Sequence, residues 1–393
     1  MWSLSGRYCI AGVGESERSK NSGVSPLHMA TVAARNAIVD AGIEPNDIDC
    51  VLSYQHSDSC DGHSLATSLG IRPKFYMDTF GGGSSTEMLI ATAIGLIEAG
   101  LCSTALIYRS MNGRSGKRMG MADENPWDLH GIMEMLIPGG SFVVPYGITS
   151  PAQQFAMVAQ RHMWETGTTE EHLASVCLSF YEYAQHNPKA VLYGKPLTME
   201  AYFEAPYIVT PFRMHDCCVE TDEANALIVT SRERAADCRL PLVKIMGVTA
   251  RNCAPHANQY AMRDITVVGA HYAAPEVFGM SGIGPKDVNV AAIYDCFSWV
   301  VLAQLEAYGF VNRGEAGPFV AAGNLRKDGI LPSNTAGGMC AEGYTHGMNN
   351  VIELVRQLRH EYKGTVRQIE GCEIGFASGW DGPHAASAML LAR

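Results

Sequence analysis

A short internal repeat constrains the fold of this chain more than any other feature of its sequence. The segment AGIEPNDIDCVLSY begins at Ala41, and SGIGPKDVNVAAIY begins at Ser281. Four residues recur 240 positions apart, which pairs Gly42, Ile43, Pro45 and Asp47 with Gly282, Ile283, Pro285 and Asp287. Each copy ends a helix with glycine, turns through proline and aspartate, and enters an apolar strand. Chance can produce four matches in so short a window, but the shared pattern favours a duplicated α/β half.

Hydrophobic periodicity elsewhere fits two such halves, which we predict at 1–235 and 236–393. Segments 30–41 and 351–360 follow the 3.6-residue period of a helix. Short apolar runs are typical of buried strands, and they occur at 105–109, 226–230, 243–248 and 388–391. Strands that alternate with helices imply layered α/β units. The stretch 113–207 is richer in Met, Trp, Tyr, His and Pro, and it predicts a mostly helical excursion from the first half, placed where it could cover a site.

Composition limits the partners and the compartment. The chain has 29 basic and 40 acidic residues, a net charge of −11, which argues against nucleic acid or an anionic membrane as the main partner. Twelve cysteines occur without any CxxC spacing, so free thiols in a reducing cytoplasm are favoured over disulfides or zinc. The N-terminus has no signal-peptide pattern, and the most apolar helix, Met88–Ile97, is too short to span a bilayer. We expect a cytoplasmic protein without a membrane span.

Two segments have the composition of ligand-binding loops. FGGGSST, at 80–86, runs into a long apolar helix, and helix N-termini carry unpaired N–H donors that stabilise anions. A plain turn with a serine N-cap explains this segment about equally well. The loop from Asn334 to Gly347 places Tyr344 and His346 among several glycines, which lets the backbone approach a ligand closely. A purely structural loop is again a fair alternative.

Other polar segments are weaker signals on their own. Tyr294, Asp295 and Cys296 follow the second copy's strand, at an end where α/β proteins commonly bind ligands. A tyrosine there is more often a packed amphipathic residue. Ser378 and Gly379 lie near the last strand. The segment HSDSCDGH, at 56–63, suggests a metal site, but its spacing matches no common one, and we interpret it as a polar loop.

Together these segments resemble the thiolase superfamily, and within it the sterol-carrier or lipid-transfer branch, over nearly the whole chain. In that family the first loop presents a nucleophilic cysteine, and alignment through the helix puts that position at Gly83, followed by Ser84. The branch's His-Asp-Cys-Phe becomes Tyr294-Asp-Cys-Phe, and the histidine of its Gly-His-Pro-x-Gly becomes Tyr344. The C-terminal catalytic cysteine of typical thiolases has no counterpart, and Ser378-Gly379 occupies that neighbourhood.

The resemblance implies a thiolase fold, with two βαβαβαββ-type halves in an α-β-α-β-α arrangement, and a homodimer. A thiolase needs an acyl-enzyme, which Gly83 cannot form, whereas tyrosine can transfer protons. The sequence is most similar to the thiolase-like steroid side-chain aldolases of bacterial sterol degradation. Their reaction is retro-aldol cleavage of 17-hydroxy-3-oxopregn-4-ene-20-carboxyl-CoA to androst-4-ene-3,17-dione and propionyl-CoA. The implied partner is the OB-fold/zinc-ribbon domain of a hydratase subunit, in an α2β2 assembly, and no metal or other cofactor is expected.

Site roles follow from that resemblance. Tyr344 is favoured as base, with His346 near enough to assist, and Tyr294 as acid, although the sequence leaves the two tyrosines interchangeable. Backbone N–H groups around Gly83 and Ser84 would hold the thioester oxygen. Asp295 is expected to orient its neighbours, and Cys296 and Cys340 to pack as small hydrophobic residues. Ser378 and Gly379 complete the predicted binding residues. Arg114, Lys117 and Arg118 form either an anchor for CoA or an ordinary solvated turn.

Two other functions remain open at this point. An acyltransferase could use Cys296 or Cys340 as a relocated nucleophile. A catalytically silent lipid-carrier or scaffold subunit would also lack the nucleophilic cysteine, although two tyrosine substitutions argue against simple loss of function.

Overall fold

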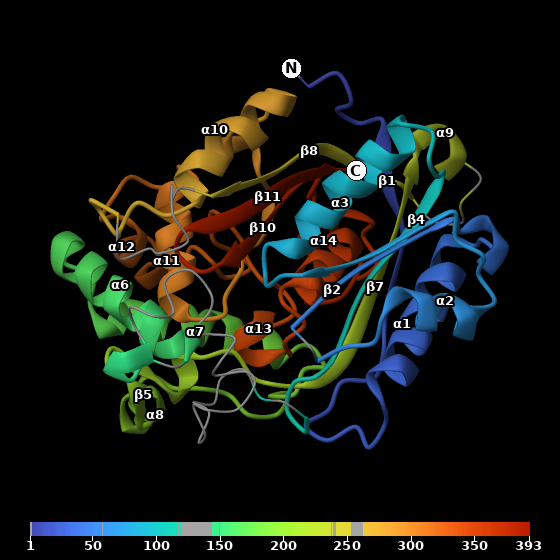
Figure 1. The fold of residues 1–393 in the computed structure, drawn as a ribbon. Coiled ribbons are helices and arrows are strands. Elements are labelled where there is room, and N and C mark those ends of the chain that lie inside the picture. Colours follow the sequence, from blue (N-terminus) through green and yellow to red (C-terminus); the bar gives the residue numbers. More distant parts are fainter. Residues whose placement is uncertain are drawn as a thin grey trace.

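A large mixed sheet runs through the molecule (Figure 1). The computed structural model describes residues 2–56, 58–116, 118, 144–148, 150–236, 238, 241–252 and 262–393. The nine strands lie in the order β3-β2-β4-β7-β1-β8-β11-β10-β9. Their bounds are β1 (Tyr8–Glu15), β2 (Cys50–Gln55), β3 (Phe75–Phe80), β4 (Thr104–Asn112), β7 (Asp222–Ser231), β8 (Val243–Asn252), β9 (Val290–Ala292), β10 (Ile374–Asp381) and β11 (Ala385–Ala392). The four strands predicted from apolar runs lie within β4, β7, β8 and β11.

The strand pairing is the same on the two sides of the junction between β1 and β8. On one side β3, β2 and β4 are parallel, and the pairs β4–β7 and β7–β1 are antiparallel. On the other side β9 and β10 are parallel, and β10–β11 and β11–β8 are antiparallel. Ser333 forms a parallel bridge to Ala291 of β9, in the place that β3 takes beside β2. This correspondence supports the duplication, while the boundary at 235/236 stays a prediction.

The two repeat segments adopt the same local structure. Gly42 ends α1 (Pro26–Ala41) with φ 71°, and Gly282 ends α10 (Ala270–Ser281) with φ 75°, so both occupy the left-handed region that glycine favours. Each is followed by a single 3₁₀ turn, η1 (Pro45–Asp47) or η5 (Pro285–Asp287). In each turn an aspartate side chain accepts a hydrogen bond from the N–H group three residues earlier. The shared residues therefore fix the entry into β2 and β9.

Helices pack on the outer sides of the sheet. Further helices lie in the middle of the molecule, between the strands on one side of the β1–β8 junction and those on the other. The central apolar core combines residues of α3 (Ser85–Glu98) and α14 (Met348–Leu358) with strands from both sides of the sheet. The outer cores contain α1 and α2 (Gly62–Leu69) on one side, and α10 and α11 (Ser298–Ala307) on the other (Figure 1). The predicted layered α/β fold class is confirmed. The helix predicted at 351–360 begins at Met348 and ends at Leu358.

The described part of the 113–207 excursion is mainly helical. It contains η2 (Val144–Tyr146), α6 (Pro151–Thr166), α7 (Glu170–Ala184) and α8 (Met199–Glu204). Its chain then enters β5 (Tyr207–Val209), which pairs with β6 (Phe212–Arg213) and leads to η3 (Met214–Asp216). Helix α7 packs against α11, α12 (Ala316–Ala321) and α13 (Gly338–Ala341), which all come from the second half. The short helix α9 (Arg232–Ala235) completes the first half.

No helix in the part of the chain that the structure describes is both long and apolar enough to cross a membrane.

Candidate active site

Two buried tyrosines meet at the centre of the candidate site. Tyr294 follows β9, and Tyr344 follows α13. Their hydroxyl oxygens lie 3.4 Å apart, within hydrogen-bond distance. The side chains are almost completely enclosed, with exposed fractions of 3% for Tyr294 and 9% for Tyr344. The structure thus brings together two hydroxyl groups that lie 50 residues apart in the sequence.

The backbone on either side of Tyr294 is held by side chains. Its N–H group donates to Ser378 Oγ at 3.1 Å, and its carbonyl oxygen accepts from Gln304 Nε2 at 2.8 Å. Asn334 binds both polar groups of the preceding residue, accepting from Ile293 N and donating to Ile293 O, each at 2.8 Å. The phenol ring therefore projects from a segment fixed at three points.

Gly83 leaves the space that the Tyr294 ring occupies. A Cβ atom on Gly83 would overlap Cζ and Oη of Tyr294, and one on Gly347 would lie 2.9 Å from Cδ2 of the same ring. A Cβ atom on Gly379 would in turn overlap the carbonyl oxygen of Gly83. The predicted nucleophile position is therefore packed against a phenol, and side chains at Gly347 or Gly379 would also crowd this contact.

The loop between β3 and α3 leads to the N-terminus of α3, where backbone N–H groups are unpaired among the described residues. Ser84 is the N-cap residue of α3 and makes no side-chain capping bond. The N–H groups of Gly83 and Ser84 have no acceptor among the described residues. Unpaired donors at a helix N-terminus favour an anion, because the helix dipole places partial positive charge there. The loop can thus present two N–H groups to an oxyanion, beside the Tyr294 phenol.

A buried polar network holds Tyr344 and the residue after it. Tyr344 N donates to Thr221 Oγ1 at 2.9 Å, and Thr345 Oγ1 donates to Glu223 Oε1 at 3.1 Å. Glu223 also pairs with Arg18, whose side chain is 4% exposed. Since Thr221 immediately precedes β7 and Glu223 is its second residue, the sheet itself positions the Tyr344 loop.

His346 lies beside Tyr344, and its Nδ1 atom accepts a hydrogen bond from Arg109. The two rings are 5.0 Å apart between centroids and almost perpendicular, at 87°. Arg109 Nε donates to His346 Nδ1 at 3.3 Å, and Arg109 Nη2 lies 2.5 Å from Asp58 Oδ2. The backbone φ of His346 is 51°, in the left-handed region that side chains rarely occupy. The imidazole is therefore held next to the tyrosine pair by a buried ion pair.

Burial sets the protonation states of these three groups. It raises the pKa of Tyr294 and of Tyr344 well above the ordinary value for tyrosine. It lowers the pKa of His346 well below the ordinary value, and the nearby charge of Arg109 lowers it further. At neutral pH the site therefore contains two protonated phenols and a neutral imidazole.

Asp295 and the two cysteines make local structural contacts. Asp295 accepts from the N–H groups of Met339 at 3.1 Å and Cys340 at 3.0 Å, and from Asn350 Nδ2 at 3.0 Å. The thiol of Cys340 donates to the Asp295 carbonyl oxygen at 3.3 Å. Burial raises the pKa of both Cys296 and Cys340 well above the ordinary thiol value. These thiols are protonated at neutral pH, and a protonated thiol is a poor nucleophile.

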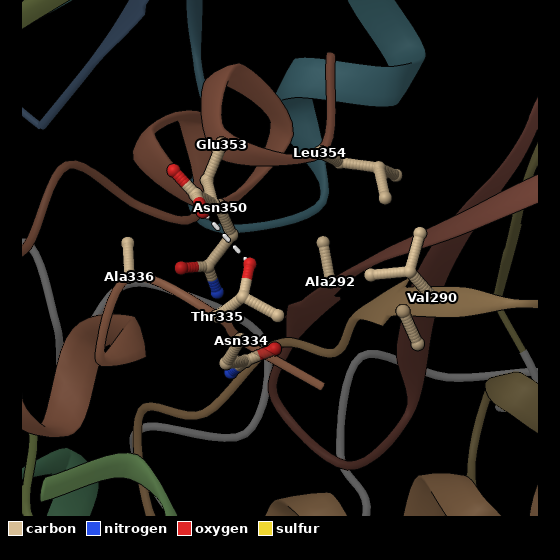
Figure 2. A pocket seen from close by; sticks show the side chains of 9 residues that line it. Val290, Ala292, Asn334, Thr335, Ala336, Asn350, Glu353 and Leu354 are labelled. Carbon is tan, nitrogen blue, oxygen red and sulfur yellow. Dashed lines mark hydrogen bonds between the residues drawn. The ribbon is translucent and has the colours of Figure 1, made fainter. Parts of the chain in front are cut away.

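A narrow crevice beside the site is closed by hydrogen bonds. Thr335 donates to Glu353 Oε1 at 2.8 Å, and Asn334 and Asn350 line the same crevice (Figure 2). It is too small to admit a ligand. Among the described residues, no group of three or more His, Cys, Asp or Glu side chains is arranged to hold a metal ion. In the basic segment, Arg118 pairs with Glu220 at 2.5 Å, and Lys117 lies outside the described residues.

All the site residues predicted from the sequence converge on this region. They are Tyr294, Tyr344, His346, Gly83, Ser84, Asp295, Cys296, Cys340, Ser378 and Gly379, and the roles assigned to them stay predictions. Among the residues that hold them, sequence reasoning missed Arg18, Asp58, Arg109, Glu223, Gln304 and Asn350. Of these, only Asp58 carried a signal, because it lies in the polar segment HSDSCDGH, whose apparent metal character reflects an arginine partner.

Comparison with known proteins identifies the family. Residues 252–393 match the family described as "Thiolase C-terminal domain-like". The chain is 36% identical to a 17-hydroxy-3-oxo-4-pregnene-20-carboxyl-CoA lyase of Mycobacterium tuberculosis, covering 93% of this chain and 95% of that protein. It is 37% identical to a steroid side-chain-cleaving aldolase of Thermomonospora curvata, covering 91% of each.

A solved structure agrees with these relatives. The structure named "Ltp2-ChsH2(DUF35) aldolase" is 34% identical, with a TM-score of 0.89, and the match covers 99% of this chain and 98% of that one. The family model, both relatives and the fold agree. The chain belongs to the thiolase superfamily, among its steroid side-chain-cleaving aldolases.

Proposed function

We propose that this protein cleaves a steroid β-hydroxyacyl-CoA by a retro-aldol reaction. The substrate is 17-hydroxy-3-oxopregn-4-ene-20-carboxyl-CoA, and the products are androst-4-ene-3,17-dione and propionyl-CoA. This substrate class is supported by the names of the relatives, which refer to the same steroid acyl-CoA and to side-chain cleavage.

The tyrosine pair is the observation that carries the proposal. Thiolase chemistry needs a cysteine that forms an acyl-enzyme. At Gly83 the chain has no side chain, and the phenol of Tyr294 fills the space where one would project. What the site offers instead is two hydroxyl groups 3.4 Å apart. Such a pair suits proton transfer without a covalent intermediate.

Because the pKa values of both tyrosines are raised, neither is a phenolate before the substrate reacts. This favours a proton relay through two protonated tyrosines. In the relay, Tyr344 accepts the proton of the substrate's C17 hydroxyl and passes its own proton to Tyr294. The C17–C20 bond breaks, the C17 oxygen becomes a ketone, and the electron pair of that bond forms the thioester enolate. Tyr294 gives its own proton to C20 in the same coupled transfer in which it receives the proton of Tyr344, so neither phenol carries two protons at any point. One proton moves from oxygen to carbon, and both tyrosines return to their starting state.

The enolate oxygen needs donors that are in place before the bond breaks. The N–H groups of Gly83 and Ser84, which have no acceptor among the described residues, fit that role. Asp295, Ser378 and Gly379 hold the surrounding backbone in this scheme. The reaction is redox-neutral and does not require a metal or other cofactor.

The assembly is the second part of the proposal. The solved relative is named as a complex with a DUF35 partner. We propose that two copies of this chain, paired as a homodimer, bind two copies of an OB-fold/zinc-ribbon domain that completes the path for CoA. Light scattering on the co-expressed proteins should show a heterotetramer. A monomer, or full activity of the isolated chain, would contradict the assembly but not the aldolase reaction. The free thiols of the described cysteines support a cytoplasmic location, because disulfides form in oxidising compartments.

The function is tested by supplying the steroid β-hydroxyacyl-CoA to the co-expressed complex and quantifying both products by mass spectrometry. Equal amounts of the 17-ketone and propionyl-CoA are expected. Binding without turnover would favour a lipid carrier, and an acylated cysteine would favour an acyltransferase. Either result would overturn the proposal.

A further inference from the structure

A completely buried ion pair lies behind the candidate site. Arg109, on β4, has a side-chain exposure of 0%, and Asp58 has 2%. The guanidinium donates in three directions: to Asp58 Oδ2 at 2.5 Å, to the Ser110 carbonyl oxygen at 2.9 Å, and to His346 Nδ1 at 3.3 Å. Burying two charges is costly, and such pairs often add little to stability. A role in the reaction would account for this pair.

We propose that Arg109, anchored by Asp58, is a positioning residue that holds His346 as the neutral tautomer with its proton on Nε2, which leaves Nε2–H as the donor of the ring that lies beside Tyr344. This inference rests on the proposed function, because it assigns His346 a role in the proton relay. From the sequence, His346 is expected to assist Tyr344 in removing a proton. In this inference His346 is instead a hydrogen-bond donor, because its only nitrogen-bound proton is on Nε2.

The hydrogen-bond chemistry of the guanidinium fixes the tautomer. Arginine carries only donors and stays charged in proteins. The Nδ1 atom of His346 must therefore present its lone pair to Arg109, and the imidazole proton must be on Nε2. A second proton on Nδ1 would point at the guanidinium, so the imidazolium is excluded while this contact exists.

Two of the groups around His346 also favour the neutral imidazole. The groups that face its ring are Arg109, Asp58, His56, Tyr54 and Tyr344. Arg109 and His56 disfavour a charge on the imidazole, and Asp58 opposes them only in part. The same arginine charge lowers the pKa of Tyr344, against the larger effect of burial. Arg109 thus keeps His346 neutral and favours transient negative charge on Tyr344.

The backbone aims the ring. His346 has φ 51° and is followed by Gly347 with φ 83°, so the chain reverses sharply at this point. The preceding Thr345 is held through its hydroxyl by Asn225 and Glu223. A left-handed backbone at a non-glycine residue persists only where its surroundings enforce it. Here they hold the imidazole perpendicular to the Tyr344 ring, 5.0 Å away.

Two variants separate positioning from structural support. In Asp58→Asn/Arg109→Gln, both charges are removed together, so no unpaired charge is buried, and the glutamine amide can bind either tautomer. In Arg109→Lys, the side chain keeps its charge and has donors only. We expect the first variant to lower kcat by about tenfold to a hundredfold with little change in KM, since the imidazole is no longer fixed. Arg109→Lys should retain more activity.

The tautomer is read directly by two-dimensional ¹⁵N NMR on histidine-labelled protein, with the His346 signals identified by their loss in His346→Asn. In the wild type we expect an unprotonated Nδ1 and a protonated Nε2 from pH 5 to pH 9, and in Asp58→Asn/Arg109→Gln a mixture of both tautomers. A proton on Nδ1 of the wild type would overturn the inference, whether or not the variant folds. Wild-type kcat and pH–rate profile in the folded double variant would also overturn it.

The NMR measurement needs no substrate, which keeps this test separate from the proposed function. If the wild type has the expected tautomer but does not cleave the steroid, the aldolase proposal fails and Arg109 still fixes the imidazole. If the wild type cleaves the steroid but carries the proton on Nδ1, only the positioning role fails.

Discussion

A Cβ atom on Gly83 would overlap the Cζ and Oη atoms of Tyr294. A side chain at the nucleophile position and a phenol at position 294 therefore exclude each other in this backbone. The two differences from the thiolase pattern, which lie more than 200 residues apart in the sequence, are one structural change. At the predicted nucleophile position a side chain has no room, because the Tyr294 hydroxyl group lies where its Cβ atom would be.

This exclusion is testable by stability. Gly83→Ala should lower the free energy of unfolding by about 1–3 kcal/mol, because it overpacks the contact with Tyr294. In a Tyr294→Val background the same change should cost measurably less, with a coupling energy on the order of 1 kcal/mol or more. Urea unfolding of the four proteins measures both quantities.

The matched control is Gly95→Ala on the same helix, α3, where a Cβ atom would meet nothing within 4 Å. That change should stabilise the protein by up to about 1 kcal/mol, because alanine is the better helix former. Equal costs of Gly83→Ala in the two backgrounds would show that Tyr294 does not constrain position 83.

The two tyrosine hydroxyls should be needed for turnover. Tyr294→Phe and Tyr344→Phe each remove one oxygen atom and should lower kcat by about a hundredfold or more, with the fold unchanged. Tyr183→Phe is the control, since this buried hydroxyl donates to the Leu325 carbonyl oxygen and has no part in the proposed relay. It should cost about 1 kcal/mol of stability and little activity. Near wild-type rates in both site variants would reject the relay.

The cysteines beside the site should not be essential. Cys296→Ser and Cys340→Ser keep a small polar side chain, and serine at position 340 can still donate to the Asp295 carbonyl oxygen. Because both thiols are protonated at neutral pH, we expect each variant to keep at least about a tenth of the wild-type kcat, since the loss is limited to packing. Complete loss of activity in a folded variant would restore the acyltransferase hypothesis.

Glu87 should make stability depend on pH. This carboxyl group, in the first turn of α3, accepts a hydrogen bond from Ser387 Oγ, and burial raises its pKa to about 7. The folded state then binds more protons than the unfolded state between pH 4.5 and pH 7, so this contribution to stability is full below pH 4.5 and is lost as pH rises through 7. The loss is on the order of 3 kcal/mol.

The comparison variant is Glu87→Gln, which has similar volume and no titration. Relative to the wild type it should gain stability between pH 5 and pH 8 in urea unfolding, while both proteins share the background of the other ionisable groups. A stability difference that does not change with pH would contradict the raised pKa of Glu87.

Local sequence features predicted much of the fold because they act over short distances. The repeated glycine, proline and aspartate fix each entry into β2 and β9 by local hydrogen bonds. Apolar runs predicted β4, β7, β8 and β11 within a few residues, since a buried strand must be apolar on both faces. The join of β1 with β8 into a single sheet depends on tertiary contacts and had no local signal.

The site also contains residues that the sequence predicted and residues that it did not. Tyr294, Tyr344 and Gly83 stood out because each replaces a residue of a known pattern. Arg109 had no such signal, because it lies in an apolar strand, and its partner His346 is 237 residues away. Glu223, which holds Thr345 beside Tyr344, was hidden for the same reason, since side-chain contacts between distant segments leave no periodic pattern.

The central claim is that cleavage runs through an enolate protonated by the tyrosine pair, without a covalent intermediate. Turnover of the steroid acyl-CoA in D₂O, followed by mass spectrometry of both propionyl-CoA and the intact protein, tests it most directly. We predict propionyl-CoA with a single deuterium at its α-carbon and a protein of unchanged mass throughout the reaction. An acylated protein, or propionyl-CoA without solvent deuterium, would contradict the account.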